Sequence, residues 1–275
     1  MTYFRPIPRS LIVGVTIPPV ALIVGFIIVP ITAFIVRSGH GLLPALTEVV
    51  TKPVYRHVTT HTLFLSFAAA AAASILGASY AATSYLSSGL ARRALLLLVT
   101  LPLSASLLAR LLAFTLLLQR YGFVNQLLIG FHFRDSPARL LYRSTTVVIG
   151  IAYVFVPYVV LIVFTALQRI DVTIVRAATS AGASLWKRLL TLEWPLARHS
   201  LVTTAGLVAV LASGYYITPA LLGGRSDQTL PMLIEMSVNR LLDWPLAAAL
   251  CLVLLGVVAS LAAIAGMTMS VVRKR

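Results

Sequence analysis

Six long apolar segments, separated by short polar stretches, constrain the fold of this chain more than any other feature. A helix needs about 20 consecutive apolar residues to cross the hydrocarbon core of a bilayer. In that core only a helix or a closed barrel pairs all of its backbone polar groups. The candidate spans are 11–36, 61–86, 94–118, 143–167, 199–217 and 246–270. The pattern therefore predicts an all-α membrane protein with six transmembrane helices.

The composition supports this class. Of the 275 residues, 59% are hydrophobic and only 11% are charged, whereas about a quarter are charged in a typical soluble domain. The net charge of +15 is also typical of nucleic-acid binding, but here the cations are scattered between apolar runs and not gathered on one soluble face. We therefore expect lipid, and no nucleic acid, around a single membrane domain that covers residues 1–275.

The second candidate span is unusually rich in small side chains. They recur at every fourth position in two series, Ala70, Ser74, Ala78 and Ala82, and Ala69, Ala73, Gly77 and Ala81. This spacing places each series on one helix face, where small residues allow a neighbouring helix to approach closely. We expect this helix to lie inside the bundle.

The distribution of Lys and Arg gives the orientation, because cytoplasmic loops carry an excess of these residues. With the N-terminus in the cytoplasm, twelve cations fall inside and nine outside, and Arg110 remains within the third span. This bias predicts cytoplasmic N- and C-termini. It also places the polar segment 171–195, between the fourth and fifth spans, in the cytoplasm.

The chain shows no motif of a catalyst. Zinc-protease, nucleophile-elbow and phosphate-loop signatures are missing from the sequence, so we expect no enzyme activity and no cofactor bound by this chain. His57 and His61 have the i,i+4 spacing of metal ligands, but no carboxylate or cysteine close in sequence completes a site. We expect no metal there.

Ion-coupled carriers usually hold Asp or Glu within their spans. All seven acidic residues of this chain fall in loops or at span edges, so the chain lacks an energy source of its own. A secondary transporter and a membrane scaffold without transport activity stay open as alternatives at this point.

The segment 171–195 is a polar interruption with its own helix signals. Asp171 is suited to cap a helix from Val172 to about Ala181, because its carboxylate can accept from unpaired N–H groups at the helix start. Gly182 can end that helix in a left-handed conformation, and Pro195 suits the first turn of the fifth span. The small side chains between these signals form a smooth ridge that another protein can bind. The alternative is an ordinary amphipathic loop.

The sequence RAATSAGASLWKRLLTLEWP in this segment resembles the EAA loop of the permease subunits of binding-protein-dependent ABC importers. That pattern is Glu-Ala-Ala, three residues, Gly, nine residues, and Ile-x-Leu-Pro. Four positions match at the right spacing, namely Ala177, Ala178, Gly182 and Pro195. Leu192 replaces the isoleucine conservatively, whereas Arg176 stands in place of the glutamate and Trp194 in place of the leucine.

The flanking sequences YVFVPYVVLIVFTALQRID, YYITPALLGG and DWPLAAAL are similar to the spermidine/putrescine-type branch of that family. The resemblance implies a multi-pass subunit of the bacterial inner membrane that takes up a polyamine such as spermidine or putrescine. Related permeases for ferric iron, thiamine, phosphonates or opines share much of the pattern, so these solutes remain alternatives.

The resemblance also implies partners. They are a cytoplasmic ATPase dimer that holds ATP and Mg, a second homologous permease, and an extracytoplasmic solute-binding protein. The residues implied to dock on the ATPase are Arg176, Ala177, Ala178, Ala181, Gly182, Ala183 and Pro195.

Overall fold

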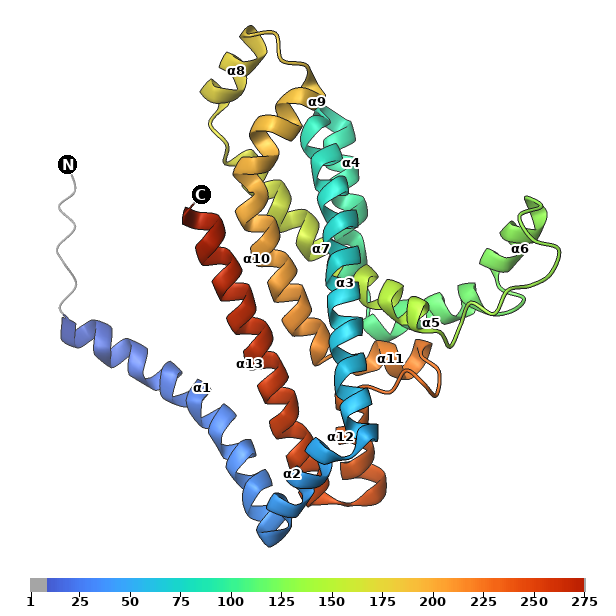
Figure 1. Cartoon of the computed structure of the whole chain (residues 1–275). Coiled ribbons are helices and arrows are strands. Elements are labelled where there is room, and N and C mark those ends of the chain that lie inside the picture. Colours follow the sequence, from blue (N-terminus) through green and yellow to red (C-terminus); the bar gives the residue numbers. More distant parts are fainter. Residues whose placement is uncertain (1–8, 275) are drawn as a thin grey trace.

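Long helices build the bundle that Figure 1 shows. The computed structural model of the chain describes residues 9–274, and these form helices and connecting turns without a strand. The five longest helices are α1 (Arg9–Ser38), α3 (Pro53–Leu86), α7 (Ser144–Gln168), α10 (Trp194–Ser213) and α13 (Trp244–Lys274). The all-α prediction is confirmed.

Five helical segments of the described residues are long and apolar enough to cross a membrane. They are Pro53–Leu86, Leu107–Gly130, Ser144–Gln168, Leu185–Ser213 and Trp244–Thr268. The predicted first span lies in α1, where Ile17–Phe26 forms a shorter apolar helix. The count of six spans therefore stays a prediction. The predicted orientation of the two termini concerns residues 1–8 and 275, which lie outside the described residues.

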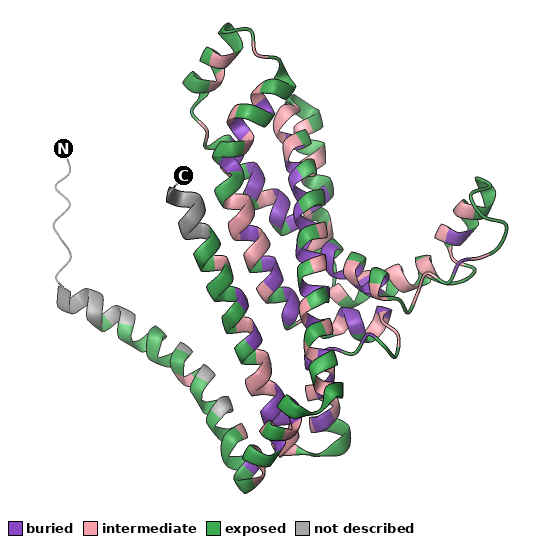
Figure 2. Ribbon diagram, viewed as in Figure 1, coloured by how far each residue is buried: buried purple, intermediate pink, exposed green. Residues whose placement is uncertain are grey.

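The small-residue faces of α3 are buried in the bundle, as predicted. Ala69, Ala73 and Ala81 have no exposed surface, and α3 packs against both α7 and α10. The buried positions of these helices form the interior of the bundle in Figure 2. Without bulky side chains on α3, the backbones of the three helices can approach closely.

The prediction of one continuous third span, 94–118, is wrong. The chain forms α4 (Gly89–Thr100), a 3₁₀ turn (Leu101–Ser104) and α5 (Leu107–Leu118). Pro102 lies in the first residues of the 3₁₀ turn. Proline has no N–H donor, and its ring clashes with the carbonyl four residues earlier, so an α-helix is broken there. Arg110 consequently lies in the first turn of α5 and not at the middle of a span.

Other boundaries also differ from the predictions. The segment between the first two predicted spans is helical: α2 (Leu42–Thr51) ends before Pro53, where α3 begins eight residues ahead of the predicted second span, 61–86. A further short helix, α6 (Phe123–Gly130), lies between the predicted third and fourth spans. The predicted fifth span, 199–217, corresponds to α10, which begins five residues earlier and ends four residues earlier.

The segment predicted as a loop, 218–245, is largely structured. It contains most of α11 (Ile217–Leu222), all of α12 (Leu230–Met236) and a π-helical turn (Ser237–Leu241). Asp227 holds it to the bundle: the carboxylate is 1% exposed and accepts hydrogen bonds from the Ser144 hydroxyl and, at 2.8 Å, from the Gly224 N–H. The Nε2 atom of His61 lies 3.6 Å from the Asp227 Oδ1 atom. Within the described residues no group of three or more His, Cys, Asp or Glu gathers as a metal site.

Candidate functional site

A short helix, α8 (Val172–Ser180), connects α7 to the segment that leads into α10, at one end of the bundle. It lies beyond the ends of the long helices, at the top of the bundle in Figure 1. The carboxyl end of α13 points toward the same side. None of its residues is buried, in contrast to α7 beside it (Figure 2). The helix is therefore available to a partner.

Local signals define both ends of α8, as predicted. The Thr173 N–H donates to the Asp171 Oδ1 atom at 2.8 Å, and this backbone hydrogen bond lowers the pKa of the Asp171 carboxyl below its ordinary value. Gly182 adopts a φ of 79°, and the Ala183 N–H donates to the Ala178 carbonyl at 3.1 Å. A left-handed residue with this bond across it is the Schellman ending of a helix.

The residues implied to dock on an ATPase occupy two places. Four of them are exposed on α8 and the turn after it, namely Arg176, Ala177, Ala181 and Gly182, and two are half-buried there, Ala178 and Ala183. Pro195 is exposed in the first turn of α10. Among the described residues the Arg176 side chain has no ion pair, so its charge is free to meet a partner.

Large apolar side chains are exposed beside this ridge. Their exposed fractions are 56% for Val172, 45% for Ile174, 58% for Leu185 and 69% for Trp186. Exposed apolar clusters of this kind mark interaction surfaces, and an exposed tryptophan is a frequent anchor in protein interfaces. The end of the bundle thus offers both a smooth helix and apolar contacts.

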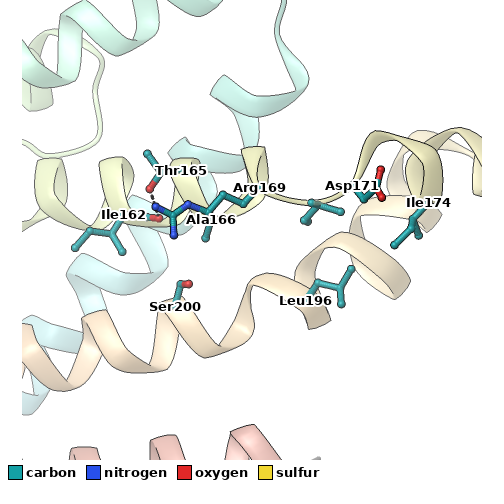
Figure 3. Close-up of a pocket in the computed structure, with 9 residues that line it drawn as sticks. Ile162, Thr165, Ala166, Arg169, Asp171, Ile174, Leu196 and Ser200 are labelled. Atoms are coloured by element: carbon teal, nitrogen blue, oxygen red, sulfur yellow. Dashed lines mark hydrogen bonds between the residues drawn. The ribbon is translucent and has the colours of Figure 1, made fainter. Parts of the chain in front are cut away.

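A cleft of about 560 Å³ lies between the end of α7, the start of α8 and the start of α10. The end of α7 contributes Arg169 to it, α8 contributes Ile174, and α10 contributes Leu196 and Ser200 (Figure 3). Asp171 lies at the junction of α7 and α8. Among the described residues α8 makes more contact with the next helix in the chain than with any of the long helices, so its position depends on its connections to α7 and to that next helix.

The segment that connects α8 to α10 contains a buried ion pair, which the sequence pattern does not predict. This connection comprises α9 (Leu185–Arg188) and a π-helical turn, η3 (Leu189–Glu193). Glu193 has no exposed surface, and its Oε1 atom lies 2.6 Å from the Arg188 Nε atom. The angles do not meet those of a hydrogen bond, so the contact is an ion pair held by charge and proximity. The two residues are five positions apart, a spacing that does not bring side chains together on a regular α-helix.

Comparisons with known proteins identify the family and the fold of this chain. The family described as binding-protein-dependent transport system inner membrane component matches residues 73–270. The spermidine/putrescine transport system permease protein PotB of Escherichia coli (strain K12) is 26% identical over 197 residues, which cover 72% of each protein. Sulfate permease 2, chloroplastic, of Chlamydomonas reinhardtii is 26% identical over 231 residues, 82% of this chain and 60% of that protein.

The fold is similar to that of a chain in the crystal structure of a bacterial ABC transporter involved in the import of the acidic polysaccharide alginate. The TM-score is 0.79, the sequence identity is 14%, and 95% of each chain is covered. The arrangement of helices is therefore that of an ABC importer permease, whereas the solutes in the names of these proteins differ.

Proposed function

The chain belongs to the family of binding-protein-dependent transport system inner membrane components, and from this premise we propose that α8 docks on a cytoplasmic ATPase that drives solute import. Membership of this family favours an ABC importer permease over the ion-coupled carrier and the scaffold. The chain is thus the membrane-spanning subunit, and we infer that ATP and Mg are held by the ATPase partner alone.

The observation that carries the proposal is the exposure of α8. The helix is capped at both ends by Asp171 and Gly182, yet it buries none of its residues. Forming an ordered helix without burial gains little free energy from within the chain, because isolated helices shorter than about 12 residues are marginal in water. A partner that covers the ridge and the apolar side chains beside it would account for an ordered helix at this exposed position.

The other partners follow from the family. A second homologous permease would complete the pathway, and an extracytoplasmic binding protein would deliver the solute. Six spans with both termini in the cytoplasm would place α8 on the same side as the ATPase. The positive bias of Lys and Arg toward that side supports this orientation.

For the solute we propose a polyamine such as spermidine or putrescine. The similarity to PotB over 72% of the chain supports this choice, although the sulfate permease shows a similar identity. Uptake of labelled spermidine by vesicles that contain the assembled complex tests it. Uptake of sulfate, a phosphonate, ferric iron, thiamine or an opine in place of spermidine would reject the polyamine and leave the docking role intact.

Replacement of Gly182 by Asp and by Asn tests the docking role. Both residues tolerate a left-handed conformation, and nothing lies within 4 Å of a Cβ atom at this position. The two variants therefore differ mainly in a negative charge on the ridge. We expect Gly182→Asp to lose ATPase co-purification and uptake, and Gly182→Asn to retain most of both, with equal amounts of each variant in the membrane. Normal ATPase binding and uptake by Gly182→Asp would contradict the proposal.

A further inference from the structure

Arg188 contacts both the exposed helix α8 and the buried π-helical turn η3, which leads into α10. Its Nε atom lies 2.6 Å from the Glu193 Oε1 atom, and its Nη1 atom donates to the Thr179 hydroxyl oxygen at 3.2 Å. We propose that the Arg188–Glu193 ion pair is the positioning contact that transmits movement of α8 into α10. This inference rests on the proposed docking of α8 to an ATPase.

The π-helical turn explains why these two side chains meet. In a regular α-helix each residue turns by about 100°, so positions five apart lie about 140° apart around the axis. The wider π-turn closes hydrogen bonds between positions five apart. The turn covers Leu189–Glu193, immediately after Arg188, and so brings Glu193 under the arginine. Such turns are frequent at functional sites.

Burial makes this pair difficult to separate. Glu193 has no exposed side-chain surface, and the Arg188 side chain is 15% exposed. Within the described residues neither oxygen of the Glu193 carboxylate accepts a hydrogen bond, so Arg188 is the group that balances its charge. Unlike charges attract strongly where water is excluded, and a buried carboxylate without its partner is strongly unfavourable. Arg188 and Glu193 should therefore move together.

The Arg188 guanidinium also makes a side-chain contact between α8 and α9. The turn between α8 and α9 contains Gly182 in a left-handed conformation, and the cleft described above lies between the start of α8 and the start of α10. The hydrogen bond from Arg188 to Thr179 links the end of α8 to α9. The buried Leu189 and Glu193 fix the other end, at η3, in the bundle. A shift of α8 is thus passed to the start of α10 through a charged contact and not through the peptide chain alone.

The test uses the full chain assembled with its second permease, the ATPase subunits and the binding protein, in vesicles. The measured quantity is the amount of solute transported per ATP hydrolysed. We expect Arg188→Gln and Glu193→Gln each to lower this ratio about fivefold or more, which is the lower range of measured couplings between sites, while the ATPase subunits still co-purify. The double variant should fall no further than either single variant, because both remove the same contact.

Two further variants test the inference even if loss of the Arg188–Glu193 pair prevents assembly of the complex. Thr179→Val removes the acceptor at an exposed position and should also lower the ratio, by a smaller factor. Lys187→Gln removes the neighbouring cation, which has no ion pair among the described residues, and should leave the ratio unchanged.

An unchanged ratio in Thr179→Val, or in the assembled Arg188→Gln and Glu193→Gln complexes, would overturn the inference. A smaller yield of complex with an unchanged ratio would overturn it too, since the pair would then serve folding alone. Failure of the unmodified chain to bind an ATPase would instead reject the proposed function.

Discussion

Gly77 on α3 lies directly against Val159 on α7. A Cβ atom on Gly77 would come within 2.7 Å of both the Cβ and Cγ1 atoms of Val159, and within 3.3 Å of the Val156 carbonyl oxygen. Real Cβ atoms do not approach other carbon atoms this closely, so the absence of a side chain sets the distance between the two helices. This contact lies in the most extensive helix pair of the bundle.

We therefore expect Gly77→Ala to destabilise the protein, by about 1–3 kcal/mol as for other overpacked interiors. The measurement is the thermal unfolding of the purified chain in detergent. Gly256→Ala is the matched control, because nothing in the described structure lies within 4 Å of a Cβ atom there. Combining Gly77→Ala with Val159→Ala should restore part of the loss. Equal melting temperatures for Gly77→Ala and the control would show that α3 and α7 are not packed as described.

A second prediction concerns the buried carboxylate of Asp227. It accepts hydrogen bonds from the Ser144 hydroxyl and the Gly224 N–H and lies near His61. Asp227→Ala leaves the two donors without their acceptor and should lower the free energy of unfolding by about 1–3 kcal/mol. It should also increase proteolysis in the segment 223–229.

The control for this experiment is Asp135→Asn, a change at an exposed carboxylate that should leave both quantities unchanged. If Asp227→Ala had the same free energy of unfolding and the same rate of proteolysis as the unmodified chain, Asp227 would not hold this segment to the bundle.

The sequence predicted those features that arise from local signals. Length and hydropathy located most of the spans, and the periodic small residues identified α3 as an interior helix. The cap at Asp171 and the left-handed Gly182 were predictable because a carboxylate before a helix and a glycine after it act through their own backbone neighbours.

Features that depend on tertiary context were missed. Pro102 lies inside the predicted third span, 94–118, whereas the chain breaks there and continues as a separate helix, α5. The pairing of Arg188 with Glu193 requires a π-turn, and the residue pattern did not predict this turn. Asp227 was assigned to a loop because its partners, Ser144 and His61, are distant in sequence.

The cap of α8 gives a prediction about pH. The Thr173 N–H favours the charged form of Asp171 and lowers its pKa from an ordinary value of about 3.9. The group therefore stabilises α8 at any pH above that value, and the contribution is lost as pH falls through the lower pKa of the folded state. Hydrogen exchange at the α8 amides, corrected for intrinsic rates, should show constant protection between about pH 5 and 8 and a loss below about pH 4.

Asp171→Ala should speed that exchange by about threefold to tenfold at neutral pH, the range expected for loss of an N-cap. Asp171→Asn keeps an acceptor and should retain most of the protection, without the loss at low pH. Equal exchange in Asp171→Ala and the unmodified chain would mean that the cap does not hold the helix.

The central claim, that α8 is a cytoplasmic docking helix for an ATPase, is tested most directly by a cysteine at Ala181. This side chain is exposed on the ridge, and replacing Cys251 with Ser leaves the new thiol as the only one in the chain. A membrane-impermeant thiol reagent should label Ala181→Cys only after cells are opened, and bound ATPase subunits should block that labelling. Labelling in intact cells, or labelling that assembled ATPase does not reduce, would contradict the account.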